Sequence, residues 1–236
     1  MTTYSPASSV GLPPKTVTRD RVIVTIAAVV WIVGTALGFG WFGGGGVESQ
    51  GNGLFSDSTT LIAPMGPAFS IWSVIYVGLL GYVIWQWLPG SAGSQWARVS
   101  RLPAAVSIAL NGVWLLVVFA GWVGVSVLVI LGIAAALGVV LHRTARLLGE
   151  GWAPKVWVAL TFGLYLGWIC VATCANIALW LVSLGMAEAS GLAVALTIAV
   201  LVVVIGLVAF LLSRTRQPVF QAALVAAVVW GISWAS

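Results

Sequence analysis

Four side chains with polar atoms recur along one apolar stretch, YLGWICVATCANIALW at residues 165–180. On a helix that turns about 100° per residue, Tyr165, Trp168, Asn176 and Trp180 fall within about 120° of one another. An amide that faces lipid is costly, whereas one that faces a protein interior or a bound molecule can be hydrogen-bonded. This face therefore predicts a site that combines flat aromatic surfaces with a few hydrogen-bonding groups.

Two other apolar stretches carry aromatic or amide residues at helical spacing. They are Phe69, Trp72, Tyr76 and Trp87 in residues 67–88, and Ser107, Asn111 and Trp114 in residues 103–120. Such polar groups can also simply join helices, at about 0.6 kcal/mol per interhelical hydrogen bond. Three faces of this kind together favour a cavity that is lined for a flat, largely apolar ligand.

The elements that position these faces are predicted to be membrane helices. Of the 236 residues, 61% are hydrophobic and 6% are charged, which excludes a water-soluble domain of this length. Each apolar run approaches or exceeds the ~20 residues that span a bilayer. The runs are residues 22–43, 67–88, 103–120, 123–142, 156–183, 191–213 and 218–235. The sequence thus predicts an all-α integral membrane protein with seven transmembrane helices.

The basic residues support this division and predict an orientation. Every Lys and Arg lies in the N-terminal tail or in alternate loops: Lys15, Arg19 and Arg21; Arg98 and Arg101; Arg143, Arg146 and Lys155; Arg214 and Arg216. Loops rich in Lys and Arg stay in the cytoplasm. We therefore expect a multi-pass protein of the cell membrane with a cytoplasmic N-terminus and a C-terminus outside. The net charge of +5 reflects this topology and does not indicate nucleic-acid binding.

The remaining segments suggest no catalytic or metal-binding group. Residues 1–21 are rich in Ser, Thr and Pro and are expected to form a disordered cytoplasmic tail. Cys170 and Cys174 lie one turn apart and away from the aromatic face, as small packing residues do. His142 stands beside Arg143 at a helix end, where it is better placed as an interfacial cap than as a haem ligand. We expect no catalytic residue and no metal site.

Three of these segments resemble the TspO/MBR family, the tryptophan-rich sensory proteins related to the mitochondrial translocator protein. APMGPAFSIWSVIYVGLLGYVIW is similar to the family's Pro-rich segment followed by F-x-x-W-x-x-x-Y. ALNGVW is similar to its L-N-x-x-W motif, and YLGWICVATCANIALW to its Y-x-x-W-x-x-x-A-x-x-x-N-x-x-x-W motif. The resemblance covers residues 22–183, so residues 191–235 would be two additional transmembrane helices.

The resemblance implies a five-helix bundle over residues 22–183 with a ligand site near one membrane face. It also implies homodimers and the binding of porphyrins and other tetrapyrroles, sterols or benzodiazepine-type drugs. By motif position, the implied ligand-binding residues are Trp72, Tyr76, Asn111, Trp114, Tyr165, Trp168, Asn176 and Trp180. The first loop departs from the family, because a Gly-, Ser- and Thr-rich segment without Lys replaces its W-Y-x-x-L-x-K-P-like segment.

Several functions agree with these features. The favoured one is a membrane-embedded sensor, regulator or carrier that binds a porphyrin, another tetrapyrrole or a sterol-like molecule between residues 67–88, 103–120 and 156–183, with no required cofactor. A facilitative transporter of an apolar metabolite or lipid is an alternative, although the helix interiors contain no charged residue of the kind used in ion coupling. A porphyrin-degrading enzyme is a further alternative. A retinal photoreceptor is excluded, because the last Lys is Lys155 in a loop.

Overall fold

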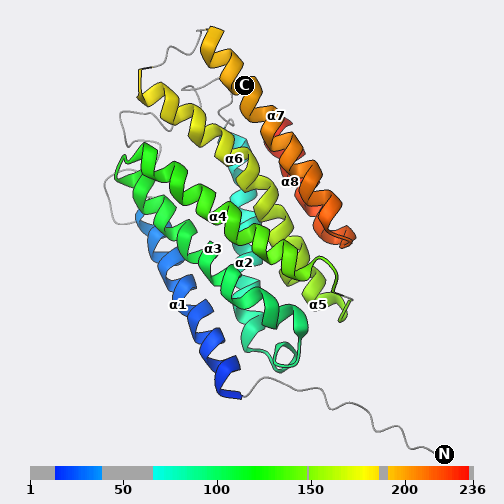
Figure 1. Cartoon of the computed structure of the whole chain (residues 1–236). Coiled ribbons are helices and arrows are strands. Elements are labelled where there is room, and N and C mark those ends of the chain that lie inside the picture. The colour runs from blue at the N-terminus through cyan, green and yellow to red at the C-terminus, as the bar shows by residue number, and fades with distance from the viewer. Residues whose placement is uncertain (1–13, 39–65, 148, 186–190, 234–236) are drawn as a thin grey trace, which may run out of the picture.

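Helices account for all the regular structure in the part of the chain that is described. The computed structural model describes residues 14–38, 66–147, 149–185 and 191–233 (Figure 1). Apolar runs fold this way in lipid because a helix satisfies its backbone N–H and C=O groups within the segment. The long helices are α1 (Pro14–Gly38), α2 (Ile71–Trp87), α3 (Gln95–Phe119), α4 (Val123–Thr144), α6 (Thr161–Ser183), α7 (Gly191–Arg214) and α8 (Pro218–Ser233).

Shorter elements extend two of these helices. The 3₁₀ segment η3 (Gly66–Ser70) leads into α2, and η4 (Pro89–Ser91) follows it. The turn α5 (Trp152–Pro154) and the π-helical segment η5 (Lys155–Leu160) run directly into α6. Within the described residues, five helical stretches are long and apolar enough to cross a membrane: Thr16–Gly38, Ala68–Trp87, Gln95–Phe119, Val123–Thr144 and Trp152–Ser183. The described parts of the last two helices form shorter apolar spans.

Two helices begin earlier than their apolar runs predict. The first helix starts at Pro14, so residues 14–21, which were expected to lie in a disordered tail, are helical. The third starts at Gln95 instead of residue 103, because the Ser94 side chain accepts a hydrogen bond from the Ala97 N–H at 3.2 Å and caps it. The helix then continues through Pro103. Both starts were missed because the first turns of these helices contain polar residues, which lie outside the apolar runs. The predicted Gly-rich loop and residues 1–13 lie outside the described residues.

The helices pack in an order that differs from their order in the chain. Helix α3 lies between α1 and α4, α4 packs on α6, and α2 lies across the bundle against α1, η5 and α6 (Figure 1). Glycines permit the closest crossings. A Cβ atom on Gly112 of α3 would lie 2.5 Å from the Val30 carbonyl oxygen of α1, and one on Gly34 would overlap the Gly112 backbone. Helices α1 and α3 therefore touch backbone to backbone at this point.

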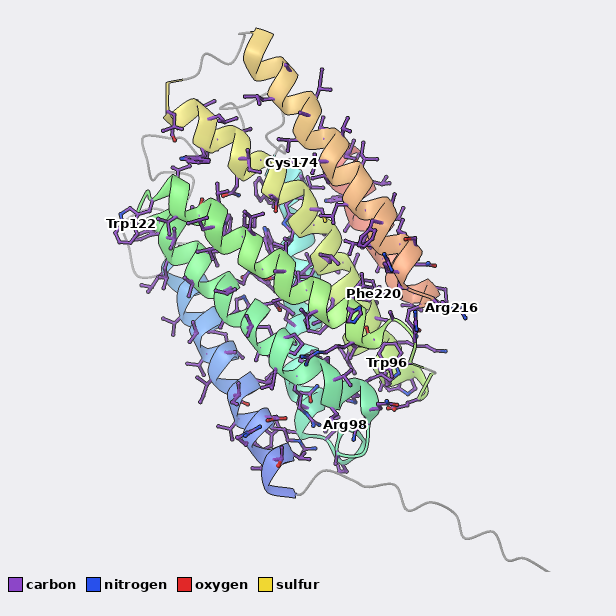
Figure 2. All side chains as sticks on the ribbon, viewed as in Figure 1. Trp96, Arg98, Trp122, Cys174, Arg216 and Phe220 are labelled. Atoms are coloured by element: carbon purple, nitrogen blue, oxygen red, sulfur yellow. The ribbon has the colours of Figure 1, made fainter. Side chains whose placement is uncertain are left out.

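Glycines on α2 and α6 allow two further crossings. A Cβ on Gly81 of α2 would overlap the Trp157 ring of η5, and one on Gly78 would lie 2.7 Å from the Thr161 hydroxyl. On the outer side of α6, a Cβ on Gly163 would lie 2.8 Å from the Phe220 carbonyl oxygen of α8. The α7–α8 pair lies beside α6, with Phe220 turned toward it (Figure 2). Both α2 and α8 thus rest on α6 and its N-terminal extension.

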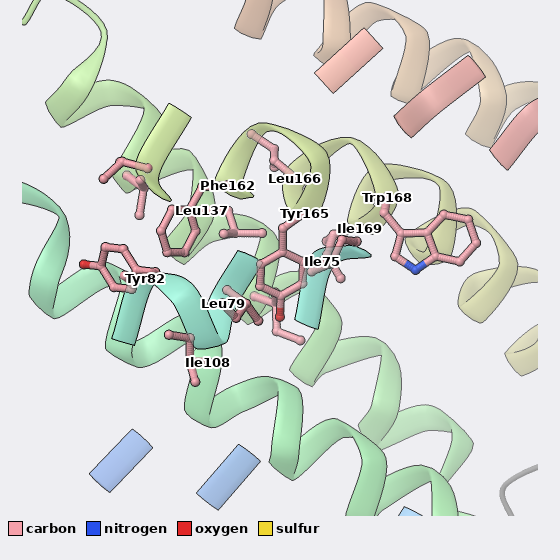
Figure 3. Close-up of a cluster of buried hydrophobic side chains, with 14 of the residues drawn as sticks. Ile75, Leu79, Tyr82, Ile108, Leu137, Phe162, Tyr165, Leu166, Trp168 and Ile169 are labelled. Carbon is pink, nitrogen blue, oxygen red and sulfur yellow. The ribbon is translucent and has the colours of Figure 1, made fainter. Parts of the chain in front are cut away.

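A fully buried apolar core fills the space between α2, α3, α4 and α6. Ile75, Leu79, Ile108, Leu137 and Phe162 belong to it, and none exposes more than 1% of its surface (Figure 3). Close packing of this kind holds the neighbouring backbones at fixed distances. Tyr165 belongs to the same buried cluster, so the core supports the aromatic residues of these helices.

The loops that carry basic residues are joined at one end of the helices. The Gln95 N–H donates to the Glu150 carboxylate at 2.9 Å, which ties the α2–α3 connection to the α4–α5 connection. The Arg216 N–H donates to the Ala145 carbonyl at 3.1 Å, and the Gln217 amide donates to the Leu147 carbonyl. Figure 2 shows Arg98 at this end and Trp122 at the other end. The alternation of charges along the sequence therefore corresponds to a separation in space.

Candidate functional site

Trp72 lies at the centre of a largely buried group of aromatic rings, which we call the Trp72 cluster. Its ring centroid is 5.2 Å from that of Tyr76, 5.9 Å from Tyr165, 6.1 Å from Trp168 and 6.5 Å from Trp114. Edge-to-face and tilted pairs at 4.5–7 Å are favourable because the positive edge of one ring meets the negative face of another. The cluster therefore joins α2, α3 and α6.

Helical spacing explains why these rings meet. Trp72 and Tyr76 are four residues apart on α2, and Tyr165 and Trp168 are three apart on α6, so each pair shares a face. The sequence correctly predicted both faces. Figure 3 shows the Tyr165 ring directed from α6 toward α2 and α3, with Trp168 one turn farther along.

Two phenol groups direct the polar side of the cluster. The Tyr76 hydroxyl donates to the Asn111 side-chain carbonyl at 3.3 Å, and the Tyr165 hydroxyl donates to the Ser107 backbone carbonyl at 3.3 Å. Both acceptors are on α3, and Asn111 is fully buried. An amide at this depth requires such a partner, because burying an unpaired polar group is costly. Tyr76 is therefore hydrogen-bonded to the Asn111 side chain, and Tyr165 to the backbone of the same helix.

Asn176 joins three helices. Its side-chain carbonyl accepts from the Ser126 hydroxyl of α4 at 2.8 Å and from the Trp114 indole N–H of α3 at 3.4 Å. Its amide nitrogen donates to the Ala172 carbonyl at 3.1 Å. Both ends of the amide are thus used inside the protein. Sequence reasoning missed Ser126, which stands alone in an apolar run.

We expect Asn176→Leu to lower the stability of the protein by about 1 kcal/mol. The change removes two interhelical hydrogen bonds, and these average about 0.6 kcal/mol each in membranes. Unfolding in mixed micelles by a denaturing detergent measures the loss of unfolding free energy. A double-mutant cycle with Ser126→Ala gives the interaction energy between Ser126 and Asn176. If the two variants were strictly additive, the Ser126–Asn176 bond would contribute nothing.

Three buried N–H donors near the cluster lack a hydrogen-bond partner. They are the Asn111 amide nitrogen, the Trp168 indole N–H and the Trp31 indole N–H. Trp31 belongs to α1, and its ring centroid is 5.0 Å from that of Tyr76. The aromatic and amide faces predicted from the sequence did not include α1, although Trp31 and Thr35 are four residues apart and share a helical face. Unpaired buried donors are rare in proteins, and each calls for an explanation such as a bound acceptor.

Two predicted residues lie away from the cluster. Trp180 is 39% exposed, and its indole nitrogen lies 3.0 Å from the place that a Cβ on Gly124 of α4 would occupy. Trp87 is 47% exposed and donates to the Thr25 hydroxyl of α1 at 3.0 Å, near the basic end. Their helical angle agrees with the others, but they are displaced along the helix axis. A helical projection alone ignores this distance.

The η3 segment covers one side of the cluster. The Phe69 ring lies 5.9 Å from that of Trp168, and the Trp230 indole N–H of α8 donates to the Ala68 carbonyl at 3.0 Å. Helix α8 thus helps to hold the segment that lies next to the rings. The sequence did not suggest a part for this helix in the site.

The described residues include the two cysteines and the single histidine of the sequence. Among them, no group of three or more His, Cys, Asp or Glu side chains could hold a metal ion. Cys170 and Cys174 are buried free thiols on α6, and His142 is exposed on the last turn of α4. The predicted roles of these three residues as packing and interfacial groups agree with these positions. The cluster offers flat apolar surfaces and N–H donors.

The described residues thus form helices, five stretches of which are long and apolar enough to cross a membrane, with a largely buried aromatic and amide cluster between them. A sequence model described as TSPO-like protein matches residues 21–235, and the chain belongs to this TSPO-like family. The match extends beyond residues 22–183 and includes α7 and α8. Neither a curated protein nor a solved structure gives a significant match.

Proposed function

We propose that the protein binds a flat hydrophobic ligand, a porphyrin or other tetrapyrrole or a sterol-like molecule, at the Trp72 cluster, and acts as a membrane sensor, regulator or carrier. The observation that carries the proposal is the set of five aromatic rings with the unpaired donors of Asn111 and Trp168 beside them. A ligand with acceptor atoms would satisfy these donors. Tetrapyrroles carry several acceptors around a flat ring system, which favours them over sterols.

The proposed site has a defined topology. Seven transmembrane helices, with the N-terminus in the cytoplasm, would place the joined basic loops on the cytoplasmic side. Helices α1 to α4 and α6 would form the five-helix bundle of the family, and α7 and α8 would cover the outer side of α6. The Trp72 cluster would then lie toward the outer face. Because Phe69 of η3 covers one side of the cluster, a ligand would enter past η3. A homodimer is also proposed, on the family resemblance alone.

A porphyrin titration tests the proposal. The purified protein in nanodiscs is titrated with protoporphyrin IX while tryptophan fluorescence is followed, and we expect saturable quenching. Trp168→Phe keeps an aromatic ring but removes the N–H donor, so the dissociation constant should rise about three- to tenfold, as for the loss of one buried hydrogen bond. Asn111→Ala should give a rise at least as large.

Trp122→Phe is the matched control for the loss of one fluorophore, because Trp122 is 63% exposed at the α3–α4 turn. Its dissociation constant should equal that of the wild type. Wild-type affinity in both Trp168→Phe and Asn111→Ala would remove the cluster from the binding site. A sterol that displaces the porphyrin competitively would assign both ligand classes to one site.

A further inference from the structure

A second polar group lies near the other end of α2, about 21 Å from Trp72 at 1.5 Å per residue. Arg101 of α3 is fully buried there. Its Nε donates to the Gln86 side-chain carbonyl at 2.8 Å, and its Nη2 donates to the Ser91 backbone carbonyl at 3.0 Å. Its Nη1 is buried and has no partner. The sequence placed Arg101 among the loop residues that set the topology, whereas the structure places it within α3 and buries its side chain.

Two neighbouring donors are also unpaired. The Gln86 amide nitrogen is buried without a partner, on the same amide that accepts from Arg101. Arg21 of α1 donates from Nη2 to the Ser91 hydroxyl at 3.0 Å, and its Nε is buried without a partner. Ser91 therefore receives one guanidinium on its hydroxyl and another on its carbonyl. Three unpaired N–H groups from α1, α2 and α3 gather around it.

The positive charge of this group is not balanced. Asp20 is the acidic side chain within electrostatic range of Arg101, but its carboxylate lies 3.1 Å from Arg19, with which it pairs. Within the described ranges, neither Arg21 nor Arg101 forms a salt bridge. A buried guanidinium without a counter-charge is strongly unfavourable. A bound anion would supply both the charge and the missing acceptors.

The surroundings match the depth of lipid headgroups. Arg21 lies over the Trp87 ring at 5.9 Å, and this indole is partly exposed next to the basic end. Tryptophan favours the membrane interface, and paired arginines recognise phosphate oxygens through several N–H donors at once. The position therefore fits a phosphate group that sits at the end of the helices.

We propose that Arg21, Gln86 and Arg101 form a binding site for one oxyanion of the phosphate class, either the phosphate of an anionic lipid or free phosphate. The bound oxyanion accepts from Arg101 Nη1, from the Gln86 amide nitrogen and from Arg21 Nε. It ties α1 to the α2–α3 connection. The site is separate from the Trp72 cluster, and it stands whether or not that cluster binds a porphyrin.

The test is the thermal stability of the full-length protein. In nanodiscs, phosphatidylglycerol is compared with phosphatidylcholine, and inorganic phosphate with chloride at equal ionic strength. A Tm that rises by about 3 °C or more with phosphatidylglycerol identifies the lipid as the source. A saturable rise with inorganic phosphate in phosphatidylcholine identifies the free ion. If neither probe raises the Tm, the site is refuted.

Three variants make the test specific. Gln86→Glu supplies an internal carboxylate to Arg101, so it should raise the Tm without the anion and abolish the response to it. Arg21→Gln should reduce the response at least fivefold and covers the case in which the first variant does not fold. Arg98→Gln is the control, since Arg98 lies on α3, the helix of Arg101, and is exposed. An equal loss of response in Arg98→Gln and Arg21→Gln would show general surface charge and overturn the site, as would a full response in Gln86→Glu.

Discussion

Gly112→Val is expected to prevent the normal packing of α1 against α3. The new Cβ would lie 2.5 Å from the Val30 carbonyl oxygen and 2.7 Å from the Trp31 Cα, both of them backbone atoms of α1. Backbone cannot rotate aside as a side chain can, so α1 must move away as a unit. Overpacking in a core typically costs about 1–3 kcal/mol, and we expect a loss at or above the upper end of this range.

Detergent extraction followed by size-exclusion chromatography measures the folded fraction of this variant, and unfolding in mixed micelles measures its stability. Displacing α1 also removes Trp31 from Tyr76, so porphyrin affinity should fall in any protein that remains folded. Gly138→Val is the matched control, because a Cβ at this position of α4 meets no atom within 4 Å. Wild-type stability in Gly112→Val would contradict the close α1–α3 contact.

Gly167→Val is expected to separate α8 from α6. The new Cβ would overlap the Leu224 carbonyl oxygen and lie 2.9 Å from the Ala227 Cβ, both on α8. The α7–α8 turn, which is held by the Arg216 N–H, should then loosen. We expect the Tm to fall by several degrees, an effect on the order of 1–3 kcal/mol.

Trypsin cleavage after Arg216 gives a second readout, because an undocked turn is cut faster than a docked one. Gly206→Val on α7 is the control, since its Cβ would meet nothing within 4 Å. Gly167→Val also tests the link between α8 and the aromatic site, because the Trp230 indole N–H of α8 donates to the Ala68 carbonyl. Unchanged cleavage and Tm in Gly167→Val would mean that α8 contributes little to the fold.

The sequence predicted where the helices lie because bilayer thickness and backbone hydrogen bonding act on each segment separately. The boundary between α3 and α4 is an example: the apolar runs break at residues 120–123, and Gly121 adopts a φ of 73°, which favours glycine. Starts in polar sequence were missed at Gln95 and Pro14, because caps and first turns carry little hydrophobic signal.

Part of the candidate site could also be predicted, because some of its features depend on one helix at a time. Trp72, Tyr76, Tyr165 and Trp168 share faces through spacing of three or four residues, which is a property of each helix alone. Spacing cannot show how far along the axis two helices meet, so Trp180 and Trp87 were grouped with rings that they do not contact. It also cannot show that lone residues on other helices, such as Trp31 and Ser126, complete the group.

The sequence by itself therefore determined the class of protein, the helical segments, the separation of basic loops and most of the aromatic faces, all of which follow from local composition and periodicity. Only the tertiary structure decided which faces meet. It packed α1 against α3 through two glycines, joined α8 to η3 by a hydrogen bond, and buried Arg101 beside Gln86 and Ser91. The physical reason is that burial and hydrogen bonding between helices depend on their axial offset and crossing points, and these are set by contacts between residues far apart in the chain.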